Sequence, residues 1–182
     1  MIKSKKDYLY FLSRDRESLK IKKRNFIIQF AKDILFPNFI WIFQRKLRKL
    51  EYYKNTQSNI FRKLMYLYLY SNYRRYQLKL GFSIPPNVFG PGLSIAHYGT
   101  IVVNGNAKIG ENCRIHIAVN IGANGGKLAP KLGDNVYIGP GAKIFGAIEI
   151  ANNVSIGANS VVNKSFNEKG ILIAGVPAKK IK

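Results

Sequence analysis

The chain of 182 residues has a single cysteine and no long uncharged apolar run, and each of these shortages excludes a class of protein. It has one cysteine, Cys113, so no internal disulfide can form, and the sequence suits a reducing compartment. It lacks a run of about 18 or more uncharged apolar residues, so no membrane-spanning helix is expected. Charges interrupt the apolar stretch near the N-terminus, so no secretory signal peptide is expected. Because 47% of the residues are hydrophobic, the chain can bury a core, which excludes disorder throughout.

Acidic residues are scarce throughout, and glycine is missing from the first 80 positions. The chain has 30 Lys and Arg against 9 Asp and Glu, a net charge of +21. Residues 1–80 hold 20 of the basic and 5 of the acidic residues (+15), and residues 81–182 hold the other 10 and 4 (+6). All 16 glycines lie from Gly81 onward. Composition therefore predicts a boundary near Gly81, between a basic segment over 1–80 and a second domain, which we expect to span 81–170 and to be followed by a C-terminal tail over 171–182.

The basic segment is predicted to be helical. Apolar residues recur at helical spacing over 26–35, from Phe39 to Tyr53 and from Ile60 to Leu80, and Pro37 ends or kinks the first stretch. The second stretch has one apolar and one basic side, which are formed by Ile40, Phe43, Leu47 and Leu50, and by Arg45, Lys46, Arg48 and Lys49. Two interpretations stay open: the apolar stripes pack within the protein, or the helices dock on an anionic membrane or an acidic polymer. No nucleic-acid-binding motif is visible, so no nucleic-acid partner is expected.

Aliphatic residues repeat at every sixth position in the second domain. The longest run is Leu132, Ile138, Ile144, Ile150, Ile156 and Val162. An earlier run is Phe89, Ile95 and Ile101, followed after a two-residue insertion by Ile109, Ile115 and Ile121. The glycine-rich residues 122–131 interrupt the repeat and are predicted to form an extruded loop. Three units of six can form one triangular coil with the aliphatic side chains inside, which predicts a β-helix rather than a β-sandwich.

Residues 81–178 resemble the hexapeptide-repeat acyltransferases, whose coils form a left-handed β-helix. The segments that carry the resemblance are GPGLSIAHYGTIVVNGNAKIGENC, VNIGANGG, KLGDNVYIGPGAKIFGAIEI, IGANSVV and AGVPAK. Within this superfamily the chain is similar to the serine O-acetyltransferase branch, and most of all to its shorter members associated with surface-polysaccharide synthesis. The expected fold class is mainly β, a left-handed parallel β-helix with an N-terminal α-helical segment.

The resemblance implies transfer of an acetyl group from acetyl-CoA to a hydroxyl group by a homotrimer, with sites between neighbouring prisms and no metal. The residue that matches the family's general base is His97. An imidazole suits this role, because it can accept the proton of a weakly nucleophilic hydroxyl at neutral pH. The residues that match CoA-binding positions of the family are Ala123, Asn124, Pro140, Ala158 and Lys179.

Three positions depart from the pattern of the serine enzymes. Phe82 and Ala96 stand where those enzymes have carboxylates, and Ala129 stands where they have a second active-site histidine. The expected acceptor is therefore a hydroxyl of a surface-polysaccharide sugar, with serine as the alternative. A third interpretation is a trimeric basic scaffold without catalytic activity.

The sequence also supports expectations about two further residues, one possible partner and the location of the protein. His116 lies about one coil after His97 and is predicted to point outward, either as a second catalytic or acceptor-binding residue or as ordinary surface. Cys113 occupies a small inward position and is predicted to be a buried core thiol. The chain ends at Lys182 without the extended tail of the serine enzymes, so no complex with cysteine synthase is expected. The expected location is the cytoplasm, or the inner face of the cell membrane if the basic helices bind it.

Overall fold

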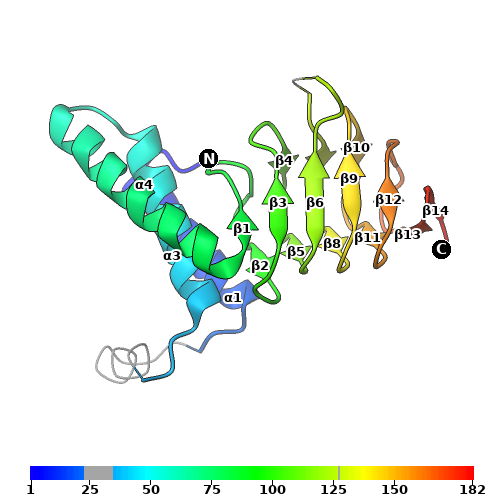
Figure 1. The fold of residues 1–182 in the computed structure, drawn as a ribbon, viewed down its shortest axis with the longest axis horizontal. Helices are drawn as coiled ribbons and strands as arrows, with labels where there is room; N and C mark the ends of the chain where they lie inside the picture. Colours follow the sequence, from blue (N-terminus) through cyan, green and yellow to red (C-terminus); the bar gives the residue numbers. More distant parts are fainter. Residues whose placement is uncertain (23–34, 127) are drawn as a thin grey trace.

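A computed structural model describes residues 1–22, 35–126 and 128–182. Three described helices, α1 (Lys5–Ser18), α3 (Phe39–Asn55) and α4 (Ile60–Leu80), pack together at the N-terminal end of a long prism of strands (Figure 1). The predicted bounds of α4 are confirmed, and α3 extends two residues beyond the prediction. Most of the predicted stretch over 26–35 lies outside the described residues. Among the described helices, none has the length and apolar character that crossing a membrane requires.

The helices begin where a side chain can cap them. Asn38 caps α3 and Asn59 caps α4, each by accepting a hydrogen bond from a backbone N–H of the first turn. Ser4 and Asp7 form a capping box at the start of α1, a helix that the apolar spacing did not predict. Gly81 ends α4 in the left-handed conformation (φ 76°), which glycine adopts without steric cost.

The strands form three sheets that make the three faces of the prism. The five-stranded sheet contains β1 (Phe82–Ser83), β3 (Ile101–Val103), β6 (Val119–Gly122), β9 (Lys143–Phe145) and β12 (Val161–Val162). The three-stranded sheet contains β4 (Lys108–Ile109), β7 (Lys131–Leu132) and β10 (Glu149–Ile150). The six-stranded sheet contains β2 (Ser94–Ile95), β5 (Arg114–Ile115), β8 (Tyr137–Ile138), β11 (Ser155–Ile156), β13 (Leu172–Gly175) and β14 (Ala178–Lys180). All pairs are parallel except the terminal pair β13–β14, which confirms the predicted β-helix.

The chain passes from the six- to the five- to the three-stranded sheet in every coil. We name the turns after the sheets they join: the 6/5 corner, the 5/3 corner and the 3/6 corner. The repeated aliphatic side chains stack inside the prism, and Ile115, Ile138 and Ile156 are fully buried in register. Cys113 is buried beside them, as predicted, and burial raises the pKa of its thiol to about 12.

The position of the two-residue insertion differs from the prediction. The sequence placed it after Ile101, but the residue in register with Ile121 is Val103, and Ile101 pairs with Val119. The extra residues therefore lie between Ile95 and Val103, in the turn of the 6/5 corner that contains His97. Both Ile101 and Val103 point inward, so spacing alone could not distinguish the two registers.

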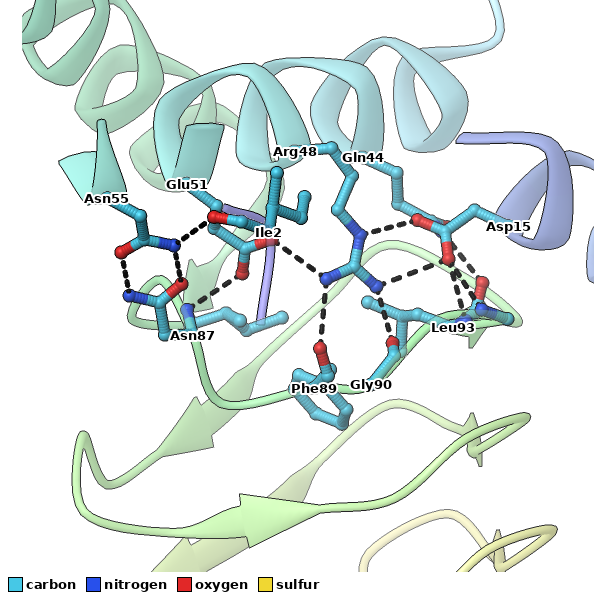
Figure 2. Close-up of polar contacts among 12 residues, drawn as sticks. Ile2, Asp15, Gln44, Arg48, Glu51, Asn55, Asn87, Phe89, Gly90 and Leu93 are labelled. Atoms are coloured by element: carbon cyan, nitrogen blue, oxygen red, sulfur yellow. Dashed lines mark hydrogen bonds and ion pairs between the residues drawn. The ribbon is translucent and has the colours of Figure 1, made fainter. Parts of the chain in front are cut away.

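A buried polar network joins the helices to the first coil of the prism (Figure 2). The sequence placed Arg48 on the basic outer side of α3, but this prediction is wrong, because its side chain is fully buried. Its guanidinium donates to both carboxylate oxygens of Asp15, to Glu51, and to the carbonyls of Phe89 and Gly90. Pairing with two carboxylates and two carbonyls compensates for the loss of water around the charge.

The backbone of the first coil is held from the helix side as well. Asp15 accepts from the N–H groups of Gly92 and Leu93, and Glu51 accepts from the N–H of Asn87. The helices therefore bind the start of the β-helix through specific hydrogen bonds as well as apolar packing.

Candidate active site

The candidate general base lies on the 6/5 corner. His97 follows β2 by two residues and is exposed in the enlarged turn that leads to β3. The N–H of Ala96 donates to the carbonyl of Ile115, so the start of this turn is fixed to the next coil. The imidazole is thus presented to solvent from a backbone that is held on one side by the sheet.

The structure places His116 next to His97. The centres of the two rings are 6.1 Å apart, and the His116 ring lies 5.2 Å from the ring of Tyr137. His116 Nε2 is buried and has no hydrogen-bond partner among the described residues. Tyr137 was not predicted as a site residue, although its register opposite Arg114 in the six-stranded sheet indicates an outward side chain near His116. The three side chains form one cluster, which we call the histidine cluster.

Burial and positive charge act on the histidine cluster. Burial lowers the pKa of His116, and the nearby Arg114 and His97 lower it further. Arg114 itself donates to the hydroxyl of Ser94. The four turns of the 6/5 corner, at 96–100, 116–118, 139–142 and 157–160, contain no Asp or Glu. The electrostatics of this corner therefore favour the neutral form of His116 and an acceptor or leaving group that is neutral or negative.

Three of the predicted CoA-binding residues lie in line with the histidine cluster. Pro140 and Ala158 are exposed in turns of the 6/5 corner in the next two coils, and the N–H of Asn159 donates to the Pro140 carbonyl. Lys179 in β14 pairs with Ala174 of β13, and Ala174 directly follows Ile173, the residue in register with Ile156 of the coil before. Small side chains followed by a lysine ammonium fit a long, thin ligand that ends in phosphates.

The other two predicted residues lie at a different corner. Ala123 and Asn124 follow β6 and begin the loop that crosses the 5/3 corner to β7. The interruption is shorter than predicted at both ends, because Gly122 belongs to β6 and Lys131 to β7. Within one chain, the strands of the five-stranded sheet separate this loop from His97. A single chain therefore presents the predicted site as two separate parts.

Two of the three departures from the serine-enzyme pattern are filled by packing. Phe82 is buried against the ring of Phe43, with ring centres 4.9 Å apart, at the junction between α3 and the five-stranded sheet. Ala129 is also buried. Neither position holds a group that could orient His97 or bind a charged acceptor. Among the described residues, no group of three or more potential metal ligands occurs.

Comparison with known proteins supports the assignment of the six-residue repeats to the hexapeptide transferases. Residues 129–164 match the family "Bacterial transferase hexapeptide (six repeats)". Serine acetyltransferases from Staphylococcus aureus and Staphylococcus epidermidis are 40% identical over 106 residues, which are 56% of this chain and 49% of those proteins. The chain thus spans about half the length of these relatives.

Solved structures resemble the whole chain. The soybean serine acetyltransferase apoenzyme superposes with a TM-score of 0.76 at 26% identity, over 97% of this chain and 69% of that chain. A serine acetyltransferase in complex with CoA gives a TM-score of 0.74 at 27% identity, over 97% of this chain and 71% of that chain. The chain therefore carries the repeats of the bacterial hexapeptide transferases on the left-handed β-helix fold of the serine acetyltransferases.

Proposed function

We propose that this protein is an acetyl-CoA-dependent O-acetyltransferase in which His97 acts as the general base. The observation that carries the proposal is the position of His97, exposed on the 6/5 corner in line with Pro140, Ala158 and Lys179. The same order, a base followed by small turn residues and a cation, is what an extended thioester substrate requires. The similarity to serine acetyltransferases, one of them solved with CoA, supports the same activity.

The proposed reaction needs one base and no covalent enzyme intermediate. The His97 imidazole accepts the proton of the acceptor hydroxyl while its oxygen attacks the thioester carbonyl carbon. The tetrahedral intermediate collapses by breaking the carbon–sulfur bond, and the CoA thiolate takes the proton from the imidazolium. The products are the acetyl ester and free CoA. The centre of the His116 ring lies 6.1 Å from that of the His97 ring, so His116 is a second candidate for contacting the acceptor beside the base.

We propose a homotrimer with one site between each pair of neighbours. The loop with Ala123 and Asn124 lies on a different corner from His97, so a second copy is needed to bring both parts together. Mixing two inactive variants tests this arrangement. Subunits with His97→Ala and subunits lacking residues 124–126 should regain activity when they are unfolded and refolded together, because some interfaces combine the intact parts. If the mixture stays inactive while both variants form trimers, the shared site is wrong.

Serine is the acceptor that the comparisons favour, because the named relatives are serine acetyltransferases. A sugar hydroxyl is a second candidate, and the structure supplies a specific reason for it. The 6/5 corner has no carboxylate, and Phe82 and Ala129 are buried in packing, so none of these positions supplies a carboxylate beside His97 to pair with the ammonium group of serine.

One assay separates the two acceptors. The purified protein is incubated with acetyl-CoA and either L-serine or a panel of sugars and acidic oligosaccharides, and products are identified by mass spectrometry. Efficient formation of O-acetylserine with unmodified sugars establishes serine. Acetylated sugar with negligible O-acetylserine establishes the second candidate. Release of CoA with neither acceptor, at the same rate in His97→Ala, contradicts acetyl transfer by this site.

A further inference from the structure

The first turns of α4 expose a set of large apolar side chains. Phe61 is 78% exposed, Tyr68 is 64% exposed and Leu64 is 55% exposed. With their neighbours they form what we call the α4 patch: Ile60, Phe61, Leu64, Met65, Leu67 and Tyr68. Residues spaced by three and four positions lie on one face of a helix, so these side chains form a contiguous surface rather than scattered contacts. Contiguous apolar surface of this kind marks an interaction site.

A basic cavity adjoins the α4 patch. It has a volume of about 460 Å³ and lies between α1, α3 and α4. Among the described residues, its lining contains three cationic side chains, several tyrosines and no carboxylate: Tyr8, Ile42, Arg45, Lys46, Lys49, Tyr68, Leu69, Asn72 and Tyr76. Because Tyr68 belongs to both features, the apolar surface leads directly into the basic cavity.

The charges of the basic cavity favour an anionic occupant. The Lys46 ammonium lies 4.7 Å from the centre of the Tyr76 ring. Burial lowers the pKa of Lys46, and the positive charges of Lys49 and Arg45 lower it further. Neither Lys46 nor Lys49 forms an ion pair with a carboxylate of the described residues. An anion in the cavity would relieve the repulsion among these cations.

We propose that the α4 patch and the basic cavity together dock the protein on a bilayer that contains anionic phospholipid. The apolar side chains of the patch enter the acyl layer, and the cavity receives a phosphate headgroup. Aromatic and basic side chains are suited to this depth, because tyrosine and lysine combine an apolar body with a polar end. The inference does not depend on acetyl transfer.

Charge complementarity favours a bilayer over a second copy of the chain. Residues 39–80 contain ten Lys and Arg and a single acidic residue, Glu51, which is buried and paired with Arg48. Contact between two such surfaces would bring like charges together, whereas an anionic bilayer offers the opposite charge. Figure 1 shows that the first turns of α4 lie at the end of the molecule away from the C-terminus, so docking there leaves the coils of the β-helix exposed.

Vesicle flotation tests the proposal. The full chain is mixed with phosphatidylcholine vesicles that contain or lack phosphatidylglycerol, at low and high salt. We expect binding only to the anionic vesicles, and weaker binding at high salt, because each basic residue near the surface strengthens binding about five-fold and salt screens this attraction. Lys46→Gln/Lys49→Gln should therefore weaken binding about 25-fold, which is two such factors multiplied.

Three comparisons make the result specific. Phe61→Ser/Leu64→Ser should also abolish flotation, while Lys169→Gln/Lys182→Gln, with the same loss of charge at the other end of the chain, should bind like the parent. Circular dichroism and light scattering check that every variant keeps its fold and oligomeric state. The proposal is overturned if anionic and neutral vesicles bind equally or if no vesicles bind. It is also overturned if the control loses as much binding as Lys46→Gln/Lys49→Gln. It is overturned as well if Phe61→Ser/Leu64→Ser dissociates the oligomer and the parent oligomer binds to no vesicles. Saturable binding of inorganic phosphate without vesicle binding would instead make the cavity a small-anion site.

Discussion

Arg48 is predicted to be the residue whose loss most weakens the junction between the helices and the β-helix. Its guanidinium is fully buried and makes five hydrogen bonds of 2.7–3.2 Å, to Asp15, to Glu51 and to two carbonyls (Figure 2). Burial alone would lower the pKa of Arg48, but Glu51 and Asp15 outweigh burial and raise it. Arg48→Met keeps an apolar stem but leaves both carboxylates buried without their cation. Breaking a buried ion pair in this way costs about 3–5 kcal/mol of unfolding free energy.

Urea unfolding measures this loss, with far-UV circular dichroism for the helices and the fluorescence of Trp41, the single tryptophan, as a probe within α3. The exposed Lys49→Met on the same helix is the matched control and should change stability by less than about 0.5 kcal/mol. The triple variant Arg48→Met/Asp15→Asn/Glu51→Gln removes all three charges while keeping oxygen acceptors for the backbone. It should recover much of the loss, because the cost arises from uncompensated charge. A loss below about 1 kcal/mol for Arg48→Met, or no recovery in the triple variant, would refute this reasoning.

Three further predictions concern the prism. Cys113, whose pKa burial raises to about 12, should resist alkylation in the native protein and react only under unfolding conditions; rapid labelling of folded protein, followed by mass spectrometry, would contradict this. Gly110→Ala should lower the unfolding free energy by about 1–3 kcal/mol, because the added Cβ would lie 2.7 Å from the carbonyl oxygen of Gly133 in the next coil; an unchanged urea midpoint would show that the coils can separate there. Burial and Arg114 lower the pKa of His116, so the folded protein binds a proton at this residue less readily than the unfolded chain does. The unfolding free energy should therefore fall as the pH drops below about 6.5. His116→Gln should make this fall less steep, and identical pH profiles of stability for the two proteins would disprove the assignment.

The repeat of the β-helix was predictable because its physical cause is local. Aliphatic side chains at every sixth position stack on one another when three units form one coil, and Ile138, Ile144 and Ile150 lie inside the prism as the spacing predicts. The helix bounds were predictable where a cap and an apolar run coincide, as at Asn59 and Ile60. The helix Lys5–Ser18 was missed because its evidence in the sequence is the Ser4–Asp7 capping box rather than a long apolar stripe.

Contacts between residues that are distant in the sequence determine several features that residue spacing could not predict. Arg48 has the sequence context of a solvated cation, and only the approach of Asp15 from α1 and of the first coil makes its burial favourable. The insertion near His97 was misplaced because Ile101 and Val103 both point inward, and the register depends on the neighbouring coil. The proximity of His97 and His116 was anticipated from counting coils, whereas the contact with Tyr137 required the structure.

The same distinction applies to the outer surface of α4. Its apolar residues recur at helical spacing. This pattern is expected both for a helix that packs within the protein and for one that docks on a partner. The exposure of Phe61, Leu64 and Tyr68 shows that packing does not bury this part of the helix. What covers it is the question that the vesicle experiment addresses.

The central claim is that His97 removes the proton of a hydroxyl acceptor during acetyl transfer from acetyl-CoA. The most direct test is the steady-state rate of acetyl ester formation by the parent protein and by His97→Ala, across L-serine and the sugar panel, with trimer formation checked for both. We predict that His97→Ala lowers kcat by roughly 10²–10⁴-fold for the preferred acceptor and leaves the KM for acetyl-CoA nearly unchanged. Retention of the parent kcat by a correctly assembled His97→Ala variant would contradict the account.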